Sequence, residues 1–314
     1  MAFRETDLLA SPRLWAEEGK VFYSFARHHS LWEILSTPQV GYLTLFNGIT
    51  SALQARVFPV EAAAAVTTYA GLLVQLVPVF LVLYTSHSFW DTPLKKVVCV
   101  LVIILATPPE LWMNTTNSHF FFGLITFLIL VIPATQLSKG KKWLFRGLLV
   151  LGNLTGPASM LLTPVFFLKA HAERSREKYI QTAIQVCCAL VQGAVTVHSL
   201  LYNNQYRRLE GNDWTLTAFL FFIDHLSLNV HAFGPIAAYA IGILVACYVI
   251  FLFVQCRGSS EHLVFLLGFL LVATFSTAGS LKMLGSPRCG RNRRSPPYSS
   301  RSAWQSIRSI TRHA

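Results

Sequence analysis

The sequence predicts an all-α polytopic membrane protein, and three observations lead to that fold class. Of its 314 residues, 53% are hydrophobic and only 13% are charged. The mean hydropathy is +0.49, and apolar runs of about 20 residues, enough to cross a bilayer core, recur along the chain. We expect about six full spans, a short helical hairpin and interfacial helices. The chain divides into a polar interfacial segment at 1–61, a transmembrane domain at 62–285 and a basic low-complexity tail at 286–314.

The net charge of +12 would suggest nucleic acid as a partner if the protein were soluble. The lysines and arginines lie mostly in short loops and in the tail, however, and loop orientation accounts for them. We therefore expect no nucleic-acid partner. The six cysteines show no CxxC or Cys/His spacing, which argues against a zinc site and a disulfide framework.

The first element expected is a helix over Leu14–Leu35, which follows a polar start without the apolar core of a signal peptide. Aromatic residues and a histidine recur along it at steps of three and four residues, a pattern typical of a helix lying in the membrane interface: Phe22, Phe25, His29 and Trp32. A second interfacial helix is expected over Gly41–Phe58, because this semi-apolar stretch carries too many polar residues to cross the bilayer.

Two adjacent carboxylates, Glu17 and Glu18, stand at the start of the first helix. Helical geometry places Glu18 over Phe22 and Phe25, so it should be the less hydrated acid, while Glu17 stays near Lys20. Desolvation and a neighbouring like charge both raise the pKa of a carboxylate, which suits a general base. The pair could instead hold a divalent cation such as Mg²⁺ or Mn²⁺ through oxygen, or simply be the solvated face of an interfacial helix.

The spans begin with Ala62–Tyr84, continue with an apolar run over 97–105 that ends before Pro108 and Pro109, and then with Phe120–Leu137. Basic residues flank the second and third spans on one side, at 95–96 and 139–146, whereas 110–119 contains no Lys or Arg. The positive-inside rule places the basic loops in the cytoplasm. The acidic pair then lies on the extracytoplasmic face.

A hairpin is expected within Trp143–Leu168, because basic clusters bracket this stretch at both ends and a single span cannot begin and end on one side. The sequence Gly152-Asn-Leu-Thr-Gly-Pro157 in its middle is a turn signal. Two short helices entering from the cytoplasmic side satisfy both constraints. Gly152 and Gly156 also fit a small-xxx-small packing motif.

The chain then crosses outward over Tyr179–Tyr202 into the polar stretch Asn203–Trp214. There Arg207 and Arg208 are candidate ligands of an anionic substrate, although ordinary loop solvation is an alternative. Further spans are expected over 234–255 and 263–284, and Lys282 at the end of the last one is another substrate-binding candidate. An acid beside a histidine, Asp224 and His225, is suggestive of a catalytic pair, but the sequence has neither a GxSxG nor an HExxH motif to go with it.

The chain resembles the GT-C class of integral membrane glycosyltransferases in the order of its segments. These are an extracytoplasmic acidic segment, Gly41-Tyr42, the spans and a Gly-Asn-Leu-Thr-Gly-Pro hairpin. Within that class it is similar to bacterial polytopic proteins with a W-x-E-D-G-type first loop. The resemblance covers roughly residues 14–285 and implies that Glu18 or Glu17 is the catalytic base or metal contact. It also implies a sugar donor carried on polyprenyl phosphate, and a glycan or lipid as acceptor.

The function expected is therefore transfer of a sugar from a polyprenyl-phosphate donor to an extracytoplasmic acceptor, by a multi-pass protein of the cell membrane, the inner membrane if the source is bacterial. A transporter or flippase is one alternative, and a non-catalytic membrane subunit is another. The proteins resembled have a span before the acidic loop and further spans after the last one here. We accordingly expect that a late start codon or a shifted reading frame near Gly285 affects the ends, the alternative being a native basic arm that binds anionic lipid headgroups.

Overall fold

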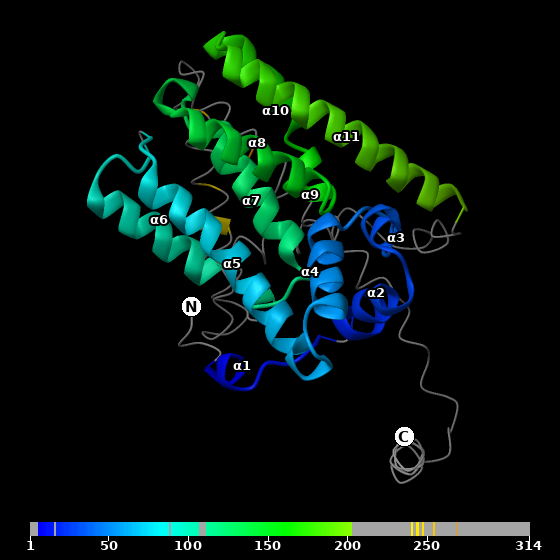
Figure 1. The fold of residues 1–314 in the computed structure, drawn as a ribbon. Helices are drawn as coiled ribbons and strands as arrows, with labels where there is room; N and C mark the ends of the chain where they lie inside the picture. The colour runs from blue at the N-terminus through cyan, green and yellow to red at the C-terminus, as the bar shows by residue number, and fades with distance from the viewer. Residues whose placement is uncertain are drawn as a thin grey trace, which may run out of the picture.

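The computed structural model of the chain describes residues 6–15, 17–87, 89–106 and 111–202, together with six isolated positions between 240 and 268. All regular structure within these residues is helical, and the all-α fold class is confirmed (Figure 1). In chain order the elements are α1 (Thr6–Ala10), the π-helical turn η1 (Glu18–Tyr23), α2 (Ser24–His28), α3 (Leu31–Ser36), α4 (Leu45–Arg56), η2 (Val60–Ala62), α5 (Ala63–Tyr84), α6 (Pro93–Ala106), α7 (Ser118–Val131), η4 (Ala134–Gln136), α8 (Lys139–Asn153), α9 (Pro157–Met160), α10 (Thr163–Glu173) and α11 (Arg176–Tyr202).

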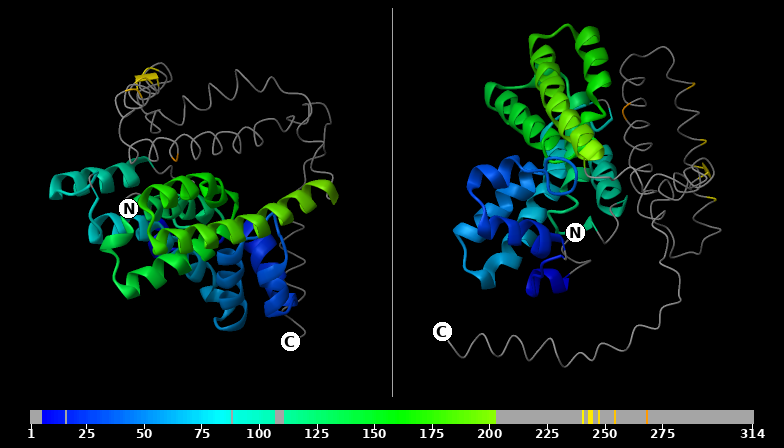
Figure 2. Two further views of the ribbon diagram at one scale, coloured as in Figure 1. Left: turned by 90° about the horizontal axis from the view of Figure 1, so that it is seen from above. Right: turned by 90° about the vertical axis from the view of Figure 1, so that its right-hand side faces the viewer.

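Helix α7 is the centre of the bundle, and its side chains make most of the main hydrophobic core with residues of α5, α8 and α10. It packs against α5 on one side and against α8 and α9 on another, while α11 lies across α8 and α10 (Figures 1 and 2). The elements η1, α2 and α3 instead pack around α4, which rests on α5, while Leu8 of α1 packs against Trp112 and Met113. The fold thus has a helical bundle and an N-terminal layer, joined through α4 and α5.

Two helices of the described part are long and apolar enough to cross a membrane, one over Val60–Tyr84 and the other over Arg176–Ser199. They coincide with the first span and the span over Tyr179–Tyr202 that the sequence predicts. The apolar runs expected at 97–105 and at Phe120–Leu137 form the shorter helices α6 and α7. The spans expected at 234–255 and 263–284, and the tail at 286–314, lie outside the residues described.

Both long helices bury polar side chains and expose several large apolar ones. On α11, Gln185 and Gln192 are fully buried, whereas Leu190 is 69% exposed. Helix α5 buries Thr67, Thr68 and Gln75 and exposes Leu73 and Phe80 among others. A soluble bundle has the opposite pattern, so this surface suits a lipid environment better than water.

The turn predicted within Trp143–Leu168 is present, but the helices on either side of it, α8 and α10, pack on α11 and not as a pair on each other. Helix α8 ends at Asn153, a tight turn follows, and Pro157 occupies the first position of α9, where its missing N–H removes no hydrogen bond. A Cβ atom on Gly156 would lie 2.6 Å from the Cβ of His119, so only glycine allows this close approach to the start of α7.

Two expectations for the N-terminal segment are wrong. A single helix over Leu14–Leu35 is interrupted at Ser30, whose hydroxyl accepts a hydrogen bond from the Glu33 N–H while the Glu33 carboxylate accepts one from the Ser30 N–H. This capping box starts a new helix in a new direction, and Trp32 is consequently 77% exposed instead of sharing a face with Phe22.

The helix expected over Gly41–Phe58 covers only Leu45–Arg56, and its polar face is packed into the protein. This helix, α4, buries its polar residues Asn47, Thr50, Ser51 and Gln54 in the protein and exposes Ile49 and Leu53. The physical reason is that these polar groups find partners on other elements, such as the carbonyl oxygens of Thr115 and Ala63.

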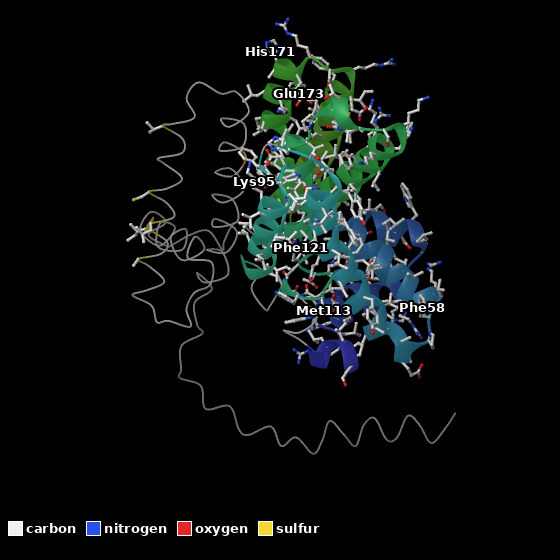
Figure 3. All side chains as sticks on the ribbon, turned by 90° about the vertical axis from the view of Figure 1, so that its left-hand side faces the viewer. Phe58, Lys95, Met113, Phe121, His171 and Glu173 are labelled. Carbon is white, nitrogen blue, oxygen red and sulfur yellow. The ribbon has the colours of Figure 1, made fainter. Side chains whose placement is uncertain are left out.

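The two ends of the bundle differ in their residues. Figure 3 shows Lys95, His171 and Glu173 towards one end and Met113 and Phe58 towards the other. We call the first the basic end, comprising 83–96, 132–142 and 169–178. The second is the acidic end, comprising 15–20, 41–47, 111–119 and 153–157.

Candidate functional site

Glu18 is buried at the acidic end, with 1% of its surface exposed. One carboxylate oxygen accepts hydrogen bonds from the Thr115 backbone N–H at 2.6 Å and from the Thr115 hydroxyl at 2.8 Å. The other accepts the backbone N–H of Trp15 at 3.1 Å. The sequence prediction that Glu18 is the less hydrated acid is confirmed, and its three donors are all neutral groups of the protein.

Glu17 is exposed, as expected of the better hydrated acid, but the ion pairs among the described residues do not include one between Glu17 and Lys20. The negative charge of Glu17 acts on Tyr42, whose pKa rises to about 12 because the phenol is buried and, secondarily, because of this charge. Tyr42 therefore remains a hydrogen-bond donor at any physiological pH. Among the described residues, no hydrogen bond or ion pair occupies the carboxylate of Glu17.

The segment 111–117, which precedes α7, is an irregular stretch held by side chains from three other elements. Gln75 of α5 donates to the Leu111 carbonyl at 2.8 Å, and Asn47 of α4 donates to the Thr115 carbonyl at 3.0 Å. Glu18 receives two further hydrogen bonds from Thr115. Gly71 of α5 permits the approach, since a Cβ atom there would lie 2.6 Å from the Asn114 nitrogen. Buried irregular backbone needs such partners, and here it has them.

Four segments that are distant in the sequence meet around Tyr42. Its ring lies edge-on to His119 at a centroid distance of 6.2 Å, and a Cβ atom on Gly156 would come within 3.6 Å of it. The turn that follows α8 also holds the chain just after Tyr42, because the Leu154 carbonyl accepts the Leu45 N–H at 2.8 Å. The acidic pair, Gly41-Tyr42, the segment before α7 and the hairpin turn thus form one site.

Of the site residues that the sequence predicts, Glu17 and Glu18 lie in this site. Arg207, Arg208 and Lys282 fall outside the described residues, as do Asp224 and His225. Thr115, Asn47 and His119 are not among the predicted residues. The signal that marks Thr115 and His119 is the polar run Asn114-Thr-Thr-Asn-Ser-His119 between two apolar helices, whereas Asn47 carries none beyond its polarity in a semi-apolar helix.

The described residues do not fit the divalent cation expected at the acidic pair. The oxygens of Glu18 face three hydrogen-bond donors, which a cation would have to displace. Within the part of the chain that the structure describes, no group of three or more His, Cys, Asp or Glu side chains could hold a metal ion.

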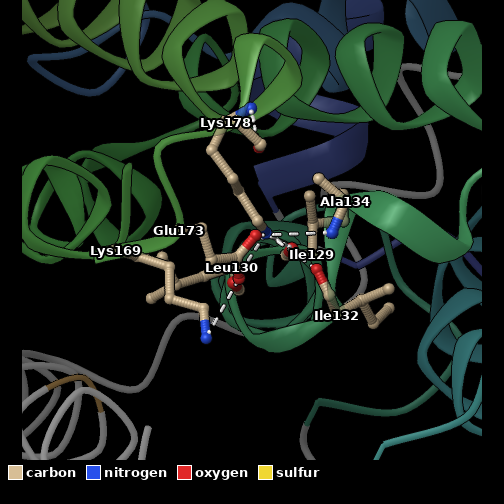
Figure 4. A network of polar contacts seen from close by, with 8 residues as sticks. Ile129, Leu130, Ile132, Ala134, Lys169, Glu173 and Lys178 are labelled. Atoms are coloured by element: carbon tan, nitrogen blue, oxygen red, sulfur yellow. Dashed lines mark hydrogen bonds and ion pairs between the residues drawn. The ribbon is translucent and has the colours of Figure 1, made fainter. Parts of the chain in front are cut away.

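A second buried charge lies at the basic end (Figure 4). Lys178, at the start of α11, is 1% exposed and donates to three carbonyl oxygens at the C-terminus of α7, those of Ile129 at 3.1 Å, Leu130 at 2.8 Å and Ile132 at 2.8 Å. Nearby, Lys169 pairs with Glu173 at 3.1 Å and Arg146 pairs with Glu177 at 2.6 Å. These hydrogen bonds and ion pairs indicate a structural role. We call the cluster of Lys178, Lys169, Glu173, Arg146 and Glu177 the structural lock.

The chain matches no protein-family model, no curated protein and no solved structure in the comparisons made.

Proposed function

We propose that the chain is a multi-pass membrane glycosyltransferase of the GT-C type, in which Glu17 is the catalytic base and Glu18 is a positioning residue. The observation that carries the proposal is an exposed carboxylate, Glu17, beside the half-buried Tyr42 in a site built from four segments. Carboxylates next to aromatic rings suit carbohydrates, because the rings pack on the apolar faces of a sugar and the carboxylate accepts its hydroxyl protons.

A membrane location is supported by the two long apolar helices and by the outward-facing apolar side chains of α4, α5 and α11. With the basic end in the cytoplasm, the acidic end lies on the extracytoplasmic side. We accordingly propose the cell membrane as its location, with a polyprenyl-phosphate sugar as donor and a glycan or lipid as acceptor.

In the proposed reaction, the acceptor hydroxyl gives its proton to the Glu17 carboxylate while its oxygen forms a bond to the anomeric carbon of the sugar. The bond between that carbon and the phosphate oxygen breaks, and the polyprenyl phosphate leaves with the electron pair. Tyr42 donates a hydrogen bond to the bound sugar. Glu18 keeps Glu17 in place, because it fixes the first turn of η1 to Thr115.

Purified full-length chain should transfer a radiolabelled hexose from polyprenyl phosphate to an added lipid or glycan acceptor. Glu17→Gln keeps the size of the side chain but removes the base, and we expect transfer to fall by about 10²–10⁴-fold with an unchanged unfolding temperature. Glu61→Gln makes the same chemical change at another exposed site and should leave transfer intact. Wild-type activity in Glu17→Gln would refute its role as base.

A transporter without chemistry is the second candidate, since Lys178 is a buried charge near the end of a candidate span. Its three carbonyl partners favour a structural role instead. Movement of the labelled lipid across liposome membranes, with no transfer to acceptor and no effect of Glu17→Gln, would favour the transporter.

A further inference from the structure

A cavity of about 160 Å³ opens at the basic end, between the C-terminus of α5 and the N-terminus of α8. It is lined by Tyr84, Thr85, Ser86, Ile132, Leu137 and Lys141. The cavity volume equals that of about five water molecules at about 30 Å³ each. A phosphate group has five heavy atoms, so the cavity is large enough to hold one. Ser86 is exposed, and its hydroxyl can donate to a bound group.

Two lysines are fixed beside this cavity by the last carbonyl groups of α5. Lys141 donates to the Tyr84 carbonyl at 3.3 Å, and Lys96 of α6 donates to the neighbouring Leu83 carbonyl at 2.7 Å. Each ammonium group has further N–H donors to offer. Lys141 therefore lines the cavity together with Ser86, and Lys96 is held at Leu83, one residue before the lining residue Tyr84.

The lysines around the cavity differ from three other cations at the basic end, which carboxylates balance. Lys95, Arg146 and Lys169 each form an ion pair with an acid. Among the described residues, no ion pair includes any of four other lysines around the cavity, namely Lys96, Lys139, Lys141 and Lys142. The first turn of α8 holds three of them and no acid, although the positive end of the helix dipole disfavours cations there. This arrangement lowers stability unless an anion joins it.

The surroundings of the cavity identify where the anion comes from. Tyr84 on its rim is 70% exposed, Leu94 of α6 is 74% exposed, and Trp143, one residue after the lysines of α8, is 70% exposed. An exposed tryptophan next to lysines and apolar side chains is typical of the membrane interface. The anion that fits this position is a lipid headgroup, because its acyl chains would contact the exposed apolar side chains.

We propose that this cavity binds the phosphate of an anionic phospholipid, held by Lys141, Lys96 and Ser86, with its acyl chains along the exposed apolar side chains of α5 and α6. The lipid supplies the negative charge that the lysines lack and ties the basic end to the bilayer surface. The site is independent of the chemistry proposed for the acidic end.

The test uses full-length protein in neutral detergent, titrated with phosphatidylglycerol or phosphatidylcholine while thermal unfolding is followed. Phosphatidylglycerol should raise the unfolding temperature with a saturating dependence on concentration, and phosphatidylcholine should not. Lys141→Gln and Lys96→Gln should each weaken the apparent affinity for phosphatidylglycerol about fivefold. Lys141→Arg should keep it, because Arg also binds phosphate.

Lys95→Gln is the matched control, since it removes one charge from the same helix end but from a lysine already paired with Asp91. It should bind phosphatidylglycerol like the wild type. Equal stabilisation by both lipids, or wild-type affinity in Lys141→Gln and Lys96→Gln together, would overturn the proposal. Stabilisation of the same size by inorganic phosphate alone would overturn the lipid as the ligand. If Lys141→Gln does not fold, Lys96→Gln alone decides the result.

Discussion

The two ends of α7 are each held by one buried charged side chain, and the charges are opposite. Glu18 accepts three hydrogen bonds next to the N-terminus of α7, two of them from Thr115. Lys178 donates three to the carbonyls at its C-terminus. A negative charge near a helix N-terminus and a positive charge near its C-terminus both act favourably on the helix dipole. The central helix is thus fixed from both ends by the N-terminal layer and by α11.

The ends differ in what surrounds the buried charge. Around Lys178 the acids Glu173 and Glu177 are paired with Lys169 and Arg146, and the ammonium group has three carbonyl acceptors for its three N–H groups (Figure 4). Around Glu18 the donors are neutral, and the adjacent Glu17 is exposed with its carboxylate unoccupied among the described residues. At the basic end, the paired charges around Lys178 have a structural role. At the acidic end, the buried Glu18 lies next to the exposed carboxylate of Glu17, which can bind a substrate.

The largest effect should come from breaking the lock at the basic end. Lys178→Met leaves three buried carbonyl groups without their donor and removes the positive charge between paired acids, and we expect a loss of about 3–5 kcal/mol in the free energy of unfolding. Denaturant titration in mixed micelles measures it. Lys20→Met, at an exposed position, should change stability by less than about 0.5 kcal/mol. Equal stability of the two variants would contradict the lock.

Breaking the anchor at the acidic end should cost less. Glu18→Ala leaves the backbone N–H of Thr115 without an acceptor, at about 1–3 kcal/mol, whereas the Thr115 hydroxyl can rotate towards another acceptor. Glu18→Gln retains one acceptor oxygen and should lose less stability than Glu18→Ala.

A double-mutant cycle with Thr115→Val isolates that contact, and the coupling free energy should be about 0.5–3 kcal/mol. Additive effects of Glu18→Ala and Thr115→Val would show that the two residues do not act together.

Overpacking the acidic end should have a comparable or smaller effect. Gly156→Ala places a Cβ atom 2.6 Å from that of His119, and the shift needed to relieve this contact should cost about 1–3 kcal/mol. The control is Gly147→Ala in the interior of α8, where a Cβ atom meets nothing within 4 Å. That change should stabilise the protein by about 0.5–1 kcal/mol, because alanine is the better helix former. Stability measured for both variants should therefore move in opposite directions.

The smallest effect on stability should come from single cysteines that report which side of the membrane each end faces. Lys20 and Gly140 are both exposed and lie at opposite ends, so Lys20→Cys and Gly140→Cys are suitable positions. In a background without the six native cysteines, an impermeant thiol reagent should label them from opposite sides of intact cells or vesicles. Labelling of both from one side would refute the proposed orientation.

Local patterns predicted much of the bundle. The spans over Ala62–Tyr84 and Tyr179–Tyr202 follow from apolar length alone, and the turn at Gly152–Pro157 follows from its glycines and proline. The break at Ser30 was readable as well, because Ser30 and Glu33 have capping-box spacing, but the aromatic periodicity across it favoured one continuous helix.

The sequence by itself determined the helical class, the two long apolar helices and the turn at Gly152–Pro157, since each depends on residues close together in the chain. Only the tertiary structure decided that the polar face of α4 lies inside the protein and that Glu18 meets Thr115, 97 residues further along the chain. It also decided that Tyr42, His119 and Gly156 share one site. A polar side chain in a membrane helix must find a partner, and which partner it finds depends on the packing of distant segments, which no local pattern specifies.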